Sequence, residues 1–212
     1  MDTLRREREE LVAACRRLAE QGLVRGSAGN VSVRAGERVA ITPTGGRLGE
    51  LAAADVPVVD LSGRVVAGRL APTSELELHL GVYARYGAGA VVHTHAPVAT
   101  ALSCVLDELP CVHYEMVALG GTVRVAPYAT FGTPELAAAV LDALEDRAAA
   151  LLSNHGAVVR ADDLATAVEL TELLEWSCTL YWRAATLGTP RVLDEAQCQA
   201  VVATAVERGY GT

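Results

Sequence analysis

Short strand patterns alternate with longer helical patterns along the whole chain, and this succession restricts the fold more than any other feature. Residues 31–41 alternate apolar and polar side chains, which predicts two strands that turn at Ala35-Gly36. A weaker strand pair is predicted at 56–60 and 64–67, joined by a turn at Gly63. Further strand patterns occupy 90–95, 111–114, 123–126, 149–154 and 157–160.

Helical periodicity predicts helices at 2–22, 74–86, 97–104, 133–144 and 162–187, and a short helix within the last 20 residues. Thr133 followed by Pro134 is typical of a helix start, and Asp162 or Asp163 is the predicted cap of the long helix. The chain contains no linker, repeat or low-complexity run. We therefore expect one α/β domain over residues 1–212, with helices on both faces of a mixed sheet.

Composition and charge exclude several classes of function. Hydrophobic residues make up 51% of the 212 residues, and the formal net charge is −8 without any basic run, which argues against a nucleic-acid partner. The N-terminal segment is charged from the start and is not a signal peptide, and no window is apolar enough to span a membrane. Five scattered cysteines fit reduced thiols in the cytoplasm.

Two of the five histidines, His93 and His95, lie one residue apart at the end of a strand pattern, in the stretch VVHTHAP. Residues i and i+2 of a strand project to the same side, so the two imidazoles can share one metal such as Zn, Fe, Ni or Cu. His155 also follows an apolar run and is the natural third ligand. The alternative is that these are polar residues at strand ends. His79 and His113 fit structural or exposed roles.

Three loops are rich in glycine and hydroxyl side chains: residues 26–30, 42–46 and 72–74. Such loops direct backbone N–H groups and hydroxyls at one anion, and the third loop precedes a helix, where anions are favoured. Each loop alone could be a simple turn. Neither GxGxxG nor a P-loop is present, which argues against dinucleotide or ATP chemistry.

Taken in order, GSAGNVSVR, ITPTGG, PTSE, HTH, HYEMVALGG, APYATFGT, NHG and RGYG resemble the class II aldolase/adducin superfamily over nearly the whole chain. The resemblance implies a three-layer α/β/α domain with a central, largely antiparallel mixed sheet. It also implies a homotetramer with four-fold symmetry.

The resemblance assigns a role to each matching residue. It implies one Zn²⁺ per chain, with other divalent metals as alternatives, on His93, His95 and His155, and on Glu75 when substrate is absent. Glu75 corresponds to the catalytic acid/base, and Tyr114 to a tyrosine delivered by a neighbouring subunit. The phosphate-binding positions are Gly29, Asn30, Thr44, Gly45, Thr73 and Ser74, and the aldehyde side is shaped by Phe131 and Tyr210.

The chain has no lysine, because all 18 basic residues are arginines, and this excludes an aldolase that works through a lysine imine. The resemblance implies metal-dependent, reversible cleavage of a ketose 1-phosphate, such as L-fuculose 1-phosphate, to dihydroxyacetone phosphate and a short aldehyde such as L-lactaldehyde.

Several alternatives stay open within the superfamily: a 5-deoxypentulose-phosphate aldolase, a sugar-acid phosphate decarboxylase, a pentulose-phosphate epimerase and a methylthioribulose-phosphate dehydratase. Relatives that epimerise usually have Asp at the position of Glu75, so the glutamate favours an aldolase or decarboxylase. A non-catalytic, adducin-like interaction module is the alternative of another class.

Overall fold

The computed structural model describes residues 3–209, and in this part of the chain nine strands form one sheet. The strand order across the sheet is β4-β3-β2-β1-β5-β9-β8-β7-β6, and every neighbouring pair is antiparallel except β7 and β8. The strands are β1 (Asn30–Ala35), β2 (Arg38–Ile41), β3 (Val58–Asp60), β4 (Val65–Ala67), β5 (Ala90–Thr94), β6 (Glu108–Leu109), β7 (Val123–Ala126), β8 (Ala149–Leu152) and β9 (Gly156–Ala161).

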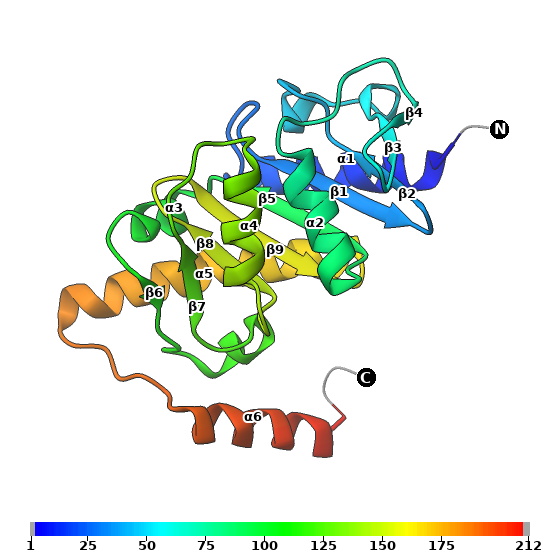
Figure 1. Ribbon diagram of the computed structural model, residues 1–212. Coiled ribbons are helices and arrows are strands. Elements are labelled where there is room, and N and C mark those ends of the chain that lie inside the picture. Colours follow the sequence, from blue (N-terminus) through cyan, green and yellow to red (C-terminus); the bar gives the residue numbers. More distant parts are fainter. Residues whose placement is uncertain (1–2, 210–212) are drawn as a thin grey trace.

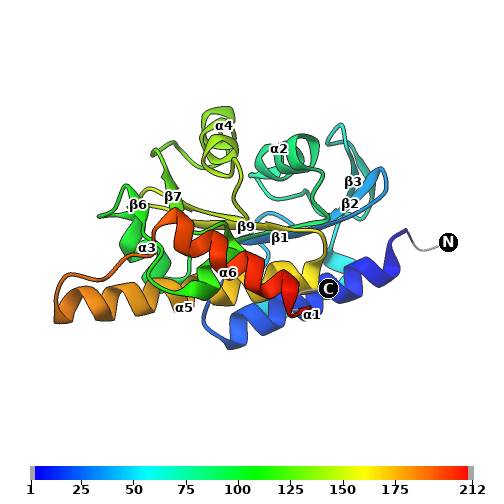
Figure 2. The ribbon, with the colours of Figure 1, turned by 90° about the horizontal axis from the view of Figure 1, so that it is seen from below.

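Helices cover both faces of this sheet, as Figures 1 and 2 show. On one face lie α2 (Leu76–Tyr86) and α4 (Pro134–Ala143). On the other lie α1 (Arg5–Glu20), α3 (Pro97–Ser103) and α5 (Leu164–Leu187). The C-terminal helix α6 (Glu195–Glu207) packs against the 3₁₀ helix η3 (Tyr114–Leu119). Two further 3₁₀ turns are η1 (Leu48–Glu50) and η2 (Ala53–Asp55). The predicted three-layer α/β/α fold with a largely antiparallel sheet is confirmed.

Two apolar cores result from the alternation of side chains along the strands. In β5, Val92 packs into the core under α1, α3 and α5, whereas Val91 packs into the core under α2 and α4. His93 follows Val91 by two residues, so the period of two directs its side chain to the α2 face. None of the helices in residues 3–209 is both long and apolar enough to cross a membrane.

The strand predicted at 111–114 is wrong. Cys111 lies in a loop, where its carbonyl accepts a hydrogen bond from Leu193 N at 2.8 Å, and Tyr114 begins η3. The His113 side chain accepts a hydrogen bond from Glu115 N, which favours the 3₁₀ turn over an extended chain. The short edge strand β6 was not predicted. Thr133 and Asp163 cap α4 and α5, as expected, each accepting a backbone N–H in the first turn.

Candidate metal centre and active site

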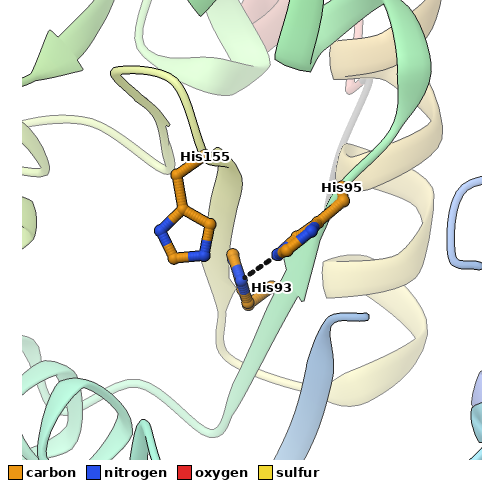
Figure 3. A group of neighbouring side chains, drawn as sticks. All are labelled: His93, His95 and His155. Atoms are coloured by element: carbon orange, nitrogen blue, oxygen red, sulfur yellow. Dashed lines mark hydrogen bonds between the residues drawn. The ribbon is translucent and has the colours of Figure 1, made fainter. Parts of the chain in front are cut away.

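Three histidines meet where β5 ends beside the turn between β8 and β9. His93 is the fourth residue of β5 and is fully buried, and its strand partners are Asn30 on β1 and Val158 on β9. His95 follows the strand by one residue, and His155 lies in the β8–β9 turn. Figure 3 shows the three imidazole rings directed toward one another from these two segments.

The ring nitrogens are close enough to hold one metal ion. One nitrogen from each histidine lies within 4.8 Å of the other two, and Nε2 of His93 is 3.0 Å from Nε2 of His95. A tetrahedral zinc with Zn–N bonds of about 2.0–2.1 Å holds its ligand nitrogens about 3.3 Å apart. His93 Nδ1 donates to the Ala157 carbonyl at 3.0 Å, which leaves the lone pair on Nε2, toward the other rings.

The surroundings favour the neutral imidazoles that bind metals. Burial, and then the neighbouring His93 and His155, lower the pKa of His95 to about 4. Burial is also the main cause that lowers the pKa of His155, followed by His93. At neutral pH both rings therefore keep a lone pair for a cation.

Glu75 completes the group. It is the N-terminal cap residue of α2 and is only 6% exposed; its carboxylate lies 3.2 Å from Nε2 of His93 and 3.6 Å from Nε2 of His155. Burial opposes ionisation, but His93 and the Asn30 amide, which donates at 2.8 Å, outweigh it and hold the pKa of Glu75 below its usual value. Its Oε1 is buried without a hydrogen-bond partner in the described chain. Three nitrogens and this orphaned oxygen fit a divalent cation.

A cavity of about 340 Å³ opens beside these side chains. It is also lined by Glu75, His95 and His155, and the three predicted loops contribute Ser27, Ala28, Gly29, Asn30, Pro43, Thr44, Gly45, Thr73 and Ser74. A bridge between Pro43 and Pro72 and a hydrogen bond from Thr73 N to the Thr42 carbonyl hold two of the loops together.

The cavity offers neutral donors to an anion. The backbone N–H groups of Gly29, Gly45 and Ser74 donate to no other group within residues 3–209. No arginine is among the described residues that line the cavity. An anion here would meet backbone N–H groups and hydroxyls rather than a cationic side chain.

Two glycines permit the close packing around the histidines. Gly29 has a φ of 94°, and a Cβ at this position would lie 2.6 Å from the His93 carbonyl oxygen. A Cβ at Gly156 would lie 2.2 Å from the Thr94 carbonyl oxygen. Any other residue would therefore push the first loop or the His155 turn away from the end of β5.

One predicted residue, Tyr114, does not line this cavity. Tyr114 is 53% exposed, its hydroxyl donates to Glu115, and it lines a different groove, between η3, α5 and α6. Tyr210 lies outside the described residues. Phe131 does line the cavity and is 67% exposed.

Tyr128 and Asn154, which were not predicted, also line the cavity. Both stand inside quoted motifs, APYATFGT and NHG, so those motifs carried the signal. The expected structural role of His79 also needs refinement, because this fully buried ring is hydrogen-bonded to Asn30 beside Glu75.

Comparison with known proteins gives the class of the chain. The family model described as the class II aldolase and adducin N-terminal domain matches residues 9–182. The 5-deoxy-D-ribulose 1-phosphate aldolase of Bacillus thuringiensis serovar kurstaki is 38% identical over 199 residues, covering 92% of this chain and 93% of the relative. The L-fuculose phosphate aldolase of Escherichia coli K12 is also 38% identical, covering 85% of each chain.

The fold gives the same result. A solved L-fuculose 1-phosphate aldolase matches with a TM-score of 0.90 and 36% identity, covering 93% of this chain and 95% of the other. The chain belongs to the class II aldolase and adducin family. Among the members of that family it is similar to aldolases, and it is an enzyme of this class. The family resemblance recognised in the sequence motifs is confirmed.

Proposed function

We propose that the chain is a zinc-dependent aldolase that reversibly cleaves a ketose 1-phosphate to dihydroxyacetone phosphate and a short aldehyde. The observation that carries this proposal is a cavity lined by Glu75, His95 and His155, with His93 buried beside them, and by three loops that offer anion donors. Such a cavity can hold the phosphate at one end while the reacting carbons lie beside the acid/base. Zinc is proposed because three imidazoles with one exchangeable position form a typical catalytic zinc site.

L-Fuculose 1-phosphate is the leading candidate substrate, and L-lactaldehyde would then be the aldehyde. A 5-deoxypentulose 1-phosphate is the second candidate, because the Bacillus relative named for such a substrate matches over a larger share of both chains. Both substrates share C1 to C3 and the phosphate. They differ in the length of the aldehyde, which would lie on the side of Phe131 and Tyr128. We propose that Tyr210, which lies outside the described residues, also borders the aldehyde.

The metal, when bound by the histidines, supplies Lewis-acid stabilisation of the negative charge that develops as C3–C4 breaks. In condensation the ionised carboxylate of Glu75 removes a proton from C3, and in cleavage the protonated carboxyl returns this proton to C3 and is left ionised. The hydroxyls of Thr44, Thr73 and Ser74 and the nearby free N–H groups orient the phosphate, and the cavity thereby fixes the reacting carbons beside Glu75.

We also propose that the chain works as a homotetramer in which Tyr114 of one subunit takes the proton from the C4 hydroxyl bound in its neighbour. The support is that Tyr114 does not line the cavity of its own chain and is exposed beside an apolar groove. The five cysteines are free, which supports the cytoplasm as the proposed location.

The test begins with metal content, followed by assay of dihydroxyacetone phosphate release from L-fuculose 1-phosphate and from 5-deoxy-D-ribulose 1-phosphate. We expect about one zinc per chain and release that is lost on chelation and restored by zinc. Glu75→Gln should keep the zinc and lose about 10²–10⁴-fold in kcat, because the acid/base is removed.

Glu77→Gln is the matched control, since the same chemical change is made two residues away at an exposed position of α2. It should retain wild-type turnover. Zinc without release from either sugar would reject the aldolase, and release of CO₂ or water from a related substrate would identify a decarboxylase or a dehydratase. Normal turnover in Glu75→Gln would reject the role of this residue.

A further inference from the structure

A chain of buried hydrogen bonds runs from the interior of the protein to Glu75. The Tyr83 hydroxyl is 2.5 Å from Ser32 Oγ, which is 2.6 Å from His79 Nδ1. His79 Nε2 is 2.5 Å from Asn30 Oδ1, and Asn30 Nδ2 is 2.8 Å from Glu75 Oε2. Asn30 and Ser32 lie on the α2 face of β1, and His79 and Tyr83 lie one turn apart on α2. All five residues are at most 6% exposed.

The chemistry of the groups gives this chain one direction. An ionised carboxylate only accepts hydrogen bonds, so Asn30 must turn its NH₂ toward Glu75 and its carbonyl oxygen toward His79. His79 must then carry its proton on Nε2. Its Nδ1 accepts from the Ser32 hydroxyl, and the Ser32 oxygen accepts from the Tyr83 hydroxyl. Every donor in the chain therefore points toward Glu75.

His79 is a neutral ring with one proton to place. Burial lowers the pKa of His79 to about 3, although the nearby Glu75 opposes the shift. Because the ring is fully buried, no water competes for Nε2 or Nδ1. Reversing the Asn30 amide would set its NH₂ against the Nε2–H of His79, so the two side chains hold each other in one arrangement.

We propose that His79 is a positioning residue, which locks the Asn30 amide in the orientation that donates to Glu75. This inference rests on the proposed role of Glu75 as the acid/base. With Oε2 held by Asn30, the buried Oε1 is the oxygen left without a hydrogen-bond partner in the described chain, 3.6 Å from His155 Nε2. The lock thus presents Oε1 to the cavity in a fixed direction.

The first test compares His79→Leu with His79→Gln in the zinc-loaded protein. Leucine removes both hydrogen bonds, whereas glutamine keeps an N–H donor that can face Asn30. We expect kcat of His79→Leu to fall by about 10–100-fold and that of His79→Gln to recover most of this loss. In the condensation direction, where Glu75 must be ionised to remove the C3 proton, the acid limb of the kcat profile should move to higher pH in His79→Leu, because the Asn30 hydrogen bond favours the ionised carboxylate.

Val82→Ala is the matched control, because Val82 is a fully buried apolar residue of the same helix. It loosens the core and should leave the pH profile in place. Equal losses in the leucine and glutamine variants with an unmoved acid limb would overturn the proposal and leave His79 a packing residue.

The second test does not depend on activity. The ¹⁵N chemical shifts of the His79 ring in the wild-type protein report which nitrogen carries the proton. We expect a protonated Nε2 and an unprotonated Nδ1, and the opposite tautomer would overturn the lock. If neither sugar phosphate is cleaved, the proposed function fails, while the tautomer measurement still decides whether the hydrogen-bond chain has the stated direction.

Discussion

At the scale of single residues, burial decides which contacts the histidines of this site must make. His93 and His79 are both fully buried, yet one faces two other histidines and the other faces an amide and a hydroxyl. A buried imidazole must use both nitrogens, as a metal ligand or in hydrogen bonds. The neighbours, and not the residue type, therefore separate the candidate ligand from the positioning residue.

Burial of His79 should make the stability of the zinc-free protein depend on pH. Its pKa is about 3 in the folded state and about 6.5 in the unfolded chain, so the unfolded state binds more protons between these values. Stability should therefore fall as pH decreases from about 6.5. Between pH 7 and pH 5, the titration of this one group lowers the free energy of unfolding by about 2 kcal/mol.

Urea unfolding of the zinc-free protein at these two pH values checks this expectation. The decrease should be about 2 kcal/mol smaller in His79→Gln than in the wild type, because one titrating group is removed. Val82→Ala, which retains His79, should show the wild-type decrease. The same decrease in wild type and His79→Gln would contradict the buried neutral ring.

At the scale of elements, the site depends on how closely the first glycine loop approaches the end of β5. Gly29 and Gly36 both have positive φ values, 94° and 60°. A Cβ at Gly29 would contact the His93 carbonyl oxygen, whereas a Cβ at Gly36 meets nothing within 4 Å. Substitutions at the two positions therefore distinguish the cost of backbone strain alone from the added cost of a close contact.

Gly36→Ala should cost about 1–2 kcal/mol of the free energy of unfolding, because only the left-handed backbone is penalised. Gly29→Ala should cost more and should also weaken zinc binding, since the loop displaces β5 at His93. Urea unfolding and zinc titration of the two variants measure both effects. Equal destabilisation with unchanged zinc affinity would show that the close approach is unimportant.

At the scale of the whole molecule, the proposed role of Tyr114 requires a second subunit, because Tyr114 does not line the cavity of its own chain. Tyr114 is exposed on the side of η3 and α6, and Trp182 and Leu187 of α5 are also exposed, 51% and 90%. Large apolar side chains that gather in one patch are typical of surfaces that associate. The proposed homotetramer would cover such side chains and bring Tyr114 to a neighbouring cavity.

Mixing two inactive variants tests this arrangement. Glu75→Gln and Tyr114→Phe should each have little activity, but after exchange of subunits a Glu75 cavity can receive a Tyr114 from a neighbour. At equal amounts, roughly a quarter of the cavities should be complete, which sets the expected recovery of activity. No recovery after exchange, verified by mass spectrometry of the mixed oligomers, would show that Tyr114 does not act between subunits.

The sequence by itself determined the three-layer fold, the family and most residues of the candidate site, because strand and helix periodicity and eight ordered motifs are local signals. The loops at Gly29, Thr44 and Thr73 were recognisable from their residue types in the same way. The strand predicted at 111–114 failed because a pattern of only four residues carries too little information against a local turn.

Only the tertiary structure decided which side chains meet. His155 is 60 residues from His95 along the chain, and the pairing of β5 with β9 brings the two together. His79 gave no local signal of a role, since its partners Asn30 and Ser32 come from a strand more than 40 residues away. Contacts between distant segments depend on strand register and helix packing, which no short motif encodes.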